Sequence, residues 1–294
     1  MCGIVGIYLK SKKFKGSLGN MLSDMLINMG SRGPDSAGFA IYKEDEDENF
    51  KYSLCLNGTD YEKFKREIAN EITISNIEKN SDHVIMKSKN EPRDVIDILN
   101  KNFKEISIVG YGKSIEIFKQ VGEPKDVVKK FNLKSFSGTH GIGHTRMATE
   151  SAITTDGSHP YSTGEDECLV HNGSLSNHNN LRRKLKKRGI DFNSENDTEV
   201  AAGYISSNLS NKKSLNNTLK DGLKDLDGFY TFITGTRKGF AVLRDEIACK
   251  PAVIAETDDY VAIASEFQAM AHLPDVNNAK IFEPEPGVVY SWGN

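Results

Sequence analysis

The feature that most constrains this chain is its amino-terminal end, where a cysteine stands directly before a short apolar segment. Residues 3–9, GIVGIYL, are rich in Ile and Val and lie between Cys2 and Lys10. An apolar run of this length predicts a short buried strand. A strand at the very start of the chain would hold Cys2 on a rigid edge of the core.

The rest of the sequence mixes helical and strand patterns. Apolar residues recur every three or four positions over 14–29, which predicts an amphipathic helix ending near Gly30. Further helices are predicted around 181–185, from Asp197 to 209 and over 215–226. Strands are predicted at 168–171 and in a block from 229 to 265. The pattern therefore favours a mixed α+β fold.

A stretch of almost continuous charge at 43–49 interrupts this pattern. After it, the pattern predicts a helix at 94–103, a strand at 106–109 and a second helix at 114–120. We interpret residues 50–136 as an insertion or small subdomain within a domain that spans 2–294. No chemistry can be assigned to the insertion from its residues.

Charge and hydropathy narrow the classes of partner and compartment. The net charge of -3 gives no electrostatic reason to expect nucleic acid or an anionic membrane as a partner. No apolar run approaches the roughly 20 residues that span a bilayer. No charged leader precedes the first strand, so we expect a cytoplasmic protein. The cysteines lie far apart without metal-ligand spacing, and we expect no metal or cofactor on this chain.

Cys2 differs from the other cysteines because of its position. Removal of Met1 would leave its thiol beside a free α-amine, which titrates at about 7.7–8.0 against about 8.5 for the thiol. Such an amine can activate the side chain of its own residue, and Gly3 removes bulk beside it. The alternative is that Cys2 is merely a small core residue near the terminus.

Five motifs, in order along the chain, carry a family resemblance: CGIVGI after Met1, RGPDSAG at 32–38, GHTRMAT at 143–149, HNGSLSN at 171–177 and NDTEVAAGYI at 196–205. Together they resemble the class II glutamine amidotransferases, which are N-terminal nucleophile (Ntn) hydrolases. Within that family the chain is most similar to stand-alone subunits related to glutamate synthase and N-methylglutamate synthase. The resemblance implies a four-layer αββα sandwich, here with an inserted small α/β subdomain.

The resemblance also implies catalytic roles. Cys2 would attack the side-chain amide of glutamine, and the Asn172 amide with the Gly173 backbone N–H would bind the oxyanion. From the residues alone, Asn-Gly is also a common turn pair. Because the α-amine fills the role of base, His144 and His171 are expected to be hydrogen-bonded structural residues.

The amino-acid head group of glutamine requires its own contacts. By resemblance, Arg146 binds the α-carboxylate, Asp197 takes the α-ammonium, Thr149 helps complete the pocket, and Arg32 helps order the site. The competing interpretations are a surface salt bridge for Arg146, a helix N-cap for Asp197 and a turn-stabilising role for Arg32. Met147 and Glu150 depart from the usual family pattern.

The implied reaction gives a γ-glutamyl thioester, ammonia and then glutamate. The chain ends soon after this glutaminase block, so the resemblance implies that a separate synthase subunit receives the ammonia. Any flavin or iron–sulfur group would lie on that partner. Two alternatives remain: an Ntn amidase acting alone on another amide, and a non-catalytic glutamine-sensing subunit.

Overall fold

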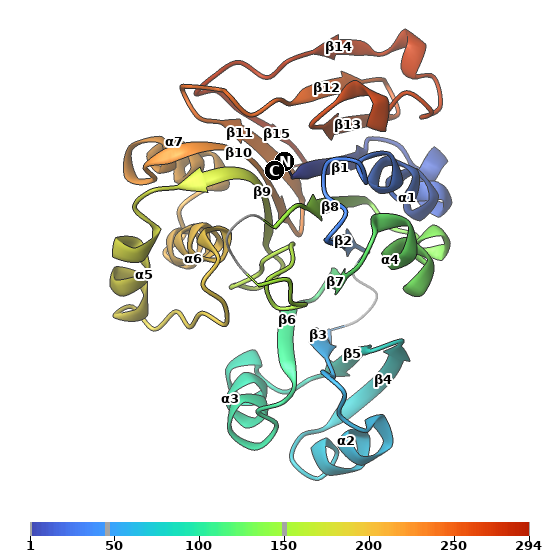
Figure 1. The fold of residues 1–294 in the computed structure, drawn as a ribbon. Coiled ribbons are helices and arrows are strands. Elements are labelled where there is room, and N and C mark those ends of the chain that lie inside the picture. The colour runs from blue at the N-terminus through green and yellow to red at the C-terminus, as the bar shows by residue number, and fades with distance from the viewer. Residues whose placement is uncertain (1, 45–47, 149–151, 294) are drawn as a thin grey trace.

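Two β-sheets packed face to face form the centre of the molecule, and helices cover the outer face of each (Figure 1). The computed structural model describes residues 2–44, 48–148 and 152–293. The first sheet is antiparallel, with strands in the order β14 (Lys280–Phe282), β12 (Val253–Glu256), β13 (Tyr260–Ala264), β1 (Gly3–Leu9), β8 (His140–Arg146), β2 (Ser36–Tyr42) and β7 (Ile115–Val121). The second has the order β15 (Val289–Trp292), β11 (Gly239–Arg244), β10 (Gly228–Thr236) and β9 (Cys168–Leu175).

The predicted first strand is confirmed as β1, which lies between β13 and β8 in the interior of the first sheet. Its side chains alternate between two apolar cores. Ile4 contributes to the core between the two sheets, whereas Val5 and Ile7 face the helices on the outer side. Because both faces of β1 are buried, the segment is continuously apolar rather than alternating with polar residues.

Helices form the two outer layers. On the first sheet lie α1 (Leu18–Asn28) and α4 (Pro124–Lys130), and on the second lie α5 (His178–Lys186), α6 (Asp197–Ser210) and α7 (Leu215–Asp225). The predicted apolar stripe of the first helix is the buried face of α1, which includes Met21, Leu22, Met25 and Leu26. The α+β class and the four-layer αββα arrangement are therefore confirmed.

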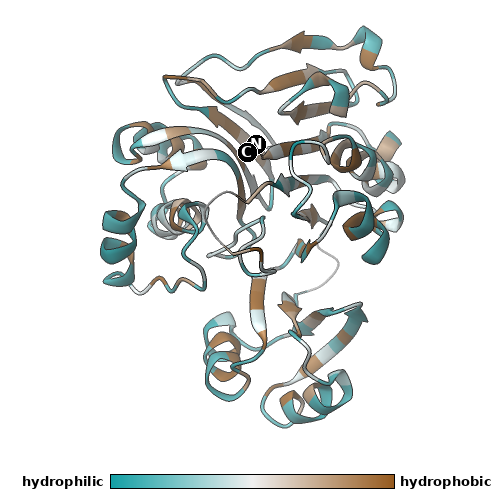
Figure 2. Ribbon diagram, viewed as in Figure 1, coloured by the Kyte–Doolittle hydropathy of each residue, from teal (hydrophilic) through white to brown (hydrophobic). Residues whose placement is uncertain are grey.

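Hydropathy follows the layers. Figure 2 shows brown, apolar segments along the central strands, whereas the outer helix α5 is largely hydrophilic. Within the described residues, no helix combines the length and apolarity needed to cross a lipid bilayer.

A third sheet with its own core projects from the sandwich (Figure 1). Its strands follow the order β4 (Ile74–Asn80), β5 (His83–Ser88), β3 (Phe50–Cys55) and β6 (Ser107–Gly112), and it carries α2 (Tyr61–Ile68) and α3 (Pro92–Asn102). This insert, residues 50–112, interrupts the chain between β2 and β7. Those strands are neighbours in the first sheet, where Tyr42 pairs directly with Ile115.

The predicted range 50–136 is wider than the third sheet, and the helix predicted at 114–120 is wrong. That segment is β7, which pairs with β2 in the first sheet, and α4 packs on α1. The physical reason is an alternation of faces: Ile115 and Ile117 enter the core between the sheets, while Phe118 enters the core under α1 and α4. Between them Glu116 is buried and forms an ion pair with Lys43, so its charge does not mark an exposed helix.

Candidate active site

Cys2 lies immediately before β1, and its side chain is partly exposed. Gly3 pairs with Thr145 of β8, and the Cys2 Sγ lies 3.9 Å from the Met147 carbonyl oxygen. A Cβ on Gly3 would stand 2.7 Å from Thr145 Oγ1 and 3.0 Å from Met29 Cβ. A larger residue at position 3 would therefore push the first strand, and Cys2 with it, away from β8.

Arg32 holds the backbone of Cys2. Its Nε donates a 3.0 Å hydrogen bond to the Cys2 carbonyl, and its guanidinium forms an ion pair with Glu266. The side chain of Arg32 is buried, so this cation is fixed rather than solvated. The next residue, Gly33, passes so close to β8 that a Cβ would lie 2.3 Å from the carbonyl carbon of Thr145. The missing side chain of Gly33 therefore lets the chain run close to β8, so that Arg32 reaches the start of β1.

Arg146 is the last residue of β8 and its side chain is buried. The alternative interpretation of Arg146 as part of a surface salt bridge is therefore wrong. Its Nη1 donates to the Ala152 carbonyl at 3.3 Å. Asp35 fixes the backbone around it: the Asp35 N–H donates to the Arg146 carbonyl at 3.1 Å, and its carboxylate accepts from the Ala148 N–H at 2.8 Å. Thr149, also expected in the pocket, lies outside the described residues, as does Glu150.

Asn172 and Gly173 belong to the interior of β9 and not to a turn. They pair with Thr231 and Tyr230 of β10. Asn172 is buried, and its Nδ2 has no hydrogen-bond partner among the described residues. Gly173 has φ +150°, and a Cβ there would stand 2.0 Å from the Phe229 carbonyl oxygen. Both the backbone conformation and the space around it therefore require glycine.

Asp197 is the first residue of α6 but not its cap. The N-cap is Asn196, whose Oδ1 accepts from the Thr198 N–H at 2.9 Å, so the capping interpretation of Asp197 is wrong. Asp197 Oδ2 instead accepts from the Leu175 N–H at 2.8 Å. This bond ties the start of α6 to the end of β9, and the carboxylate remains partly exposed.

Three buried histidines connect the two halves of the site. His144 of β8 contacts the His171 carbonyl of β9 through Nε2 at 2.9 Å, and its ring stacks on His159 at 3.8 Å. Thr198 Oγ1 lies 2.8 Å from His159 Nε2 and 2.9 Å from His171 Nδ1. Burial lowers the pKa of His144 to about 3 and also lowers the pKa of His159 and His171. The cluster is therefore neutral near pH 7 and fixes β8 against β9 and α6.

The predicted site residues fall into two groups. Cys2, Arg32 and Arg146 gather where β1 begins and β8 ends, through the contacts of Cys2 with Arg32 and Met147. Asn172, Gly173 and Asp197 gather on β9 and α6 of the facing layers. The hydrogen bond between His144 and the His171 carbonyl joins the groups. A thiol, an unpaired buried amide, a buried cation and a partly exposed carboxylate are the groups needed for acyl transfer on an amino acid.

Sequence reasoning missed the residues that support these groups. Glu266, His159 and Thr198 touch Arg32, His144 and His171 respectively, each from a distant part of the chain. A signal for Glu266 was a charge directly after the apolar strand YVAIAS. Thr198 lies in the motif NDTEVAAGYI but was not singled out, and His159 had no signal of its own.

Comparison with known proteins agrees with this geometry. Residues 144–272 match a family model described as a glutamine amidotransferase domain. The chain is 51% identical over 295 residues to the glutamine amidotransferase-like protein GlxB of Rhizobium meliloti, covering 99% of this chain and 98% of that protein. A protein of Methanothermobacter thermautotrophicus that carries glutamine amidotransferase in its name is 30% identical over 308 residues, with 99% of each chain covered.

Among solved structures, glutamine phosphoribosylpyrophosphate amidotransferase from B. subtilis superposes with a TM-score of 0.64 at 21% identity. The match covers 99% of this chain and 47% of that one. At this identity the likeness concerns the fold.

Proposed function

Because this chain belongs to the class II glutamine amidotransferases and is an enzyme of that type, we propose that it releases ammonia from glutamine with Cys2 as the nucleophile. Met1, which lies outside the described residues, is removed in the mature protein. The exposed α-amine then takes the thiol proton, so that base and nucleophile belong to one residue.

Amide hydrolysis proceeds in two steps, acylation of Cys2 and then hydrolysis of the thioester. The Cys2 sulfur bonds to the side-chain amide carbon of glutamine, and the tetrahedral intermediate collapses with cleavage of the C–N bond. The amine returns its proton to the leaving nitrogen, which departs as ammonia and leaves a γ-glutamyl thioester. Water then adds to the thioester carbon, and glutamate leaves as the Cys2 thiol is restored.

The observation that carries this proposal is the unpaired amide of Asn172 in β9. A buried donor without a partner is costly and rare in folded proteins. Such a donor stabilises an oxyanion without reorganisation when charge develops during reaction. We assign the oxyanion site to Asn172 Nδ2 and the Gly173 N–H. This is also the role that the family resemblance of the motif HNGSLSN implies for them.

Substrate recognition follows from the charged groups. Arg146 binds the α-carboxylate of glutamine, because a guanidinium offers two parallel donors to a carboxylate. Asp197 takes the α-ammonium with Oδ1, the carboxylate oxygen that Leu175 does not use. Thr149 completes the pocket. Arg32 orders the nucleophile through the Cys2 carbonyl.

The ammonia passes to a separate synthase subunit. Ammonia free in water at neutral pH becomes ammonium, which is not a nucleophile, so its use requires a closed path to the acceptor. By resemblance, the partner is glutamate synthase-like and holds any flavin or iron–sulfur group, or it belongs to the related N-methylglutamate synthases. The proposed complex lies in the cytoplasm.

The nucleophile is tested by labelling with diazo-oxo-norleucine, an electrophilic glutamine analogue, followed by mass spectrometry of the intact chain. We expect a mature mass lacking Met1 and one label per chain. Cys2→Ala should abolish both the label and glutaminase activity, whereas Cys249→Ala, which changes an exposed thiol, should preserve both. An active chain that retains Met1 would refute the mechanism.

The partner is tested separately by measuring glutaminase activity of the purified chain with and without candidate synthase subunits. We expect weak activity alone and a clear increase in the complex. Full activity of the isolated chain, unchanged by any subunit, would contradict the partner but not the role of Cys2.

A further inference from the structure

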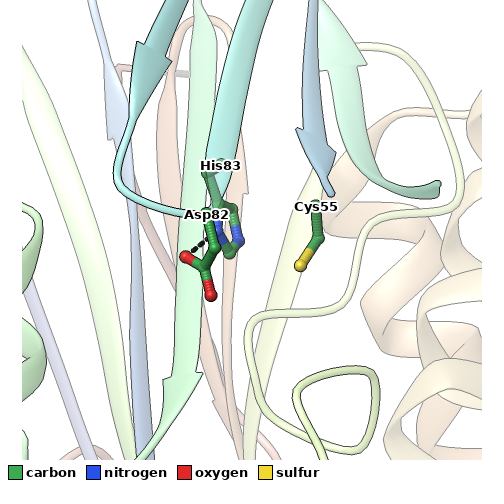
Figure 3. Close-up of side chains that lie close together, drawn as sticks. All are labelled: Cys55, Asp82 and His83. Carbon is green, nitrogen blue, oxygen red and sulfur yellow. Dashed lines mark hydrogen bonds and ion pairs between the residues drawn. The ribbon is translucent and has the colours of Figure 1, made fainter. Parts of the chain in front are cut away.

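A second cluster of reactive side chains lies in the insert, away from the site described above. Cys55 ends β3 and His83 begins β5, and the two residues are direct cross-strand partners. Opposed residues of an antiparallel pair project from the same face of the sheet. Asp82 stands in the turn before His83, and Figure 3 shows the imidazole between the Asp82 carboxylate and the Cys55 sulfur.

The hydrogen bonds of His83 leave one ring nitrogen unused. Its Nδ1 lies 3.0 Å from Asp82 Oδ1. The Asp82 carboxylate accepts this hydrogen bond, so the imidazole proton lies on Nδ1 and Nε2 presents a lone pair.

That lone pair has no partner. His83 is fully buried, and Nε2 forms no hydrogen bond within the described residues. A buried acceptor of this kind normally finds a donor or a ligand. Because Nδ1 faces Asp82, Nε2 lies on the other edge of the ring, toward the Cys55 side in Figure 3.

Cys55 supplies a matching group. It is buried, and its thiol contacts the Asn57 side-chain oxygen at 3.1 Å. One ligand atom from each of Cys55, Asp82 and His83 lies within 4.8 Å of the others. Ligand atoms of a tetrahedral zinc ion are about 3.5 Å apart, so small side-chain rotations would bring the Cys55 sulfur and the His83 ring within reach of one ion, beside the Asp82 carboxylate. Thiolate and imidazole together favour Zn²⁺ over the hard cations Mg²⁺ and Ca²⁺.

We propose that Cys55, Asp82 and His83 form a binding site for one Zn²⁺ ion in the insert. The Cys55 sulfur and His83 Nε2 bind the ion directly, and the thiol releases its proton to solvent on binding. The Asp82 carboxylate accepts the Nδ1 hydrogen, which orients the ring and makes the ligand nitrogen more basic. The side-chain oxygen of Asn57, which accepts from the Cys55 thiol, stands beside the sulfur, where it can serve as an oxygen ligand.

The site lies where the insert meets the main sandwich. The His83 ring packs against Phe118 of β7 and Phe131 after α4, at centroid distances of 5.8 and 4.9 Å. Asp82 also pairs with Lys130 of α4 at 3.0 Å. An ion that fixes His83 and Cys55 would therefore hold the ends of β3 and β5 in the position that contacts the first sheet.

The test uses the full chain with Cys2→Ala, so that the exposed amino-terminal thiol does not bind metal. The protein is incubated with Zn²⁺, freed of excess metal by gel filtration and assayed for bound zinc. We expect one equivalent per chain and a higher melting temperature than for the metal-free form. Replacement by Co²⁺ should give a thiolate-to-cobalt charge-transfer band.

Variants identify the ligands. Cys55→Ala and His83→Gln should lose the bound zinc and the charge-transfer band, and Asp82→Asn should weaken affinity roughly 10–100-fold. Cys249→Ala is the matched thiol control and should bind normally. Cys55→Ala decides the matter if His83→Gln fails to fold. Absence of stoichiometric zinc in the parent, or unchanged binding in Cys55→Ala, would overturn the proposal.

Discussion

Asn172 and Gly173 carry costs that an ordinary pair of strand residues would not. The buried Nδ2 of Asn172, which has no partner within residues 2–44, 48–148 and 152–293, costs about 1–3 kcal/mol. Gly173 adopts a backbone conformation, φ +150°, that other residues rarely take. Unfavourable features of this kind persist where the surrounding structure holds them, and they concentrate at functional sites. These two features support the proposed oxyanion site at this part of β9.

Replacing Asn172 separates catalysis from folding. In Asn172→Ala we expect kcat for glutamine hydrolysis to fall by about 10²–10³, because one donor to the oxyanion is lost. The melting temperature should stay the same or rise, since the variant loses no described hydrogen bond and removes a buried donor that has no partner among the described residues. Steady-state glutaminase kinetics and thermal unfolding check both parts. A large loss of stability with kcat retained in the folded fraction would assign Asn172 to structure alone.

Gly173 can be compared with a glycine that shares only its positive φ. The methyl group of Gly173→Ala would meet the Phe229 carbonyl at 2.0 Å, whereas a methyl group on Gly189, which has φ +83°, would have nothing within 4 Å. We expect Gly189→Ala to cost about 1 kcal/mol and Gly173→Ala clearly more. Denaturant unfolding of the two variants measures the difference, and equal costs would show that the close approach is unimportant.

At the scale of elements, sequence patterns succeeded where burial is uniform or regular. β1 was predictable because its short unbroken apolar run indicates a buried strand. α1 was predictable because its apolar residues recur with the spacing of a helix. β7 was not, because buried Glu116 and Lys119 resemble the polar face of a helix. The motif residues of the candidate site were found by resemblance, but contacts such as Arg32 with Glu266 join distant segments and leave no local pattern.

Glu167, directly before β9, predicts a pH dependence of stability. Burial raises its pKa from 4.5 to about 8. The folded chain therefore holds a proton that the unfolded chain releases between these values. Its contribution to stability is full below pH 4.5 and is lost as pH rises through about 8.

Glu167→Gln should remove this dependence, because the amide does not titrate. We expect its melting temperature to fall less than that of the wild-type protein as pH rises from about 6 to 8. Glu105→Gln, at an exposed position, is the control and should follow the wild-type curve. Parallel curves for all three proteins would mean that Glu167 is ionised in the folded state.

At the scale of the whole molecule, the insert joins the sandwich at one hairpin. Tyr42 of β2 pairs with Ile115 of β7, and the Lys43 N–H donates to the Ser114 carbonyl at 3.0 Å. A two-residue Asn-Gly turn fits such a pair of strands. Replacing residues 44–113 with Asn-Gly should therefore give a chain that folds.

This shortened chain should keep glutaminase kcat within a few-fold of the wild-type value, because the described site contacts come from outside residues 44–113. Its melting temperature should fall, since the deletion removes contacts such as the hydrogen bond from the Ile117 N–H to Ser53 Oγ. Activity assays and circular dichroism check both expectations. A folded but inactive deletion would show that the insert takes part in glutamine hydrolysis.

The position of this hairpin also bears on how the chain can change over evolutionary time. The first sheet already brings residues 42 and 115 together, so a self-contained segment placed between them adds little loop-closure cost to the sandwich. Segments of other sizes can be exchanged there while the register of β1 and β8 stays the same. The surface offered to other proteins can thus diverge without any change in the chemistry proposed for the amino terminus.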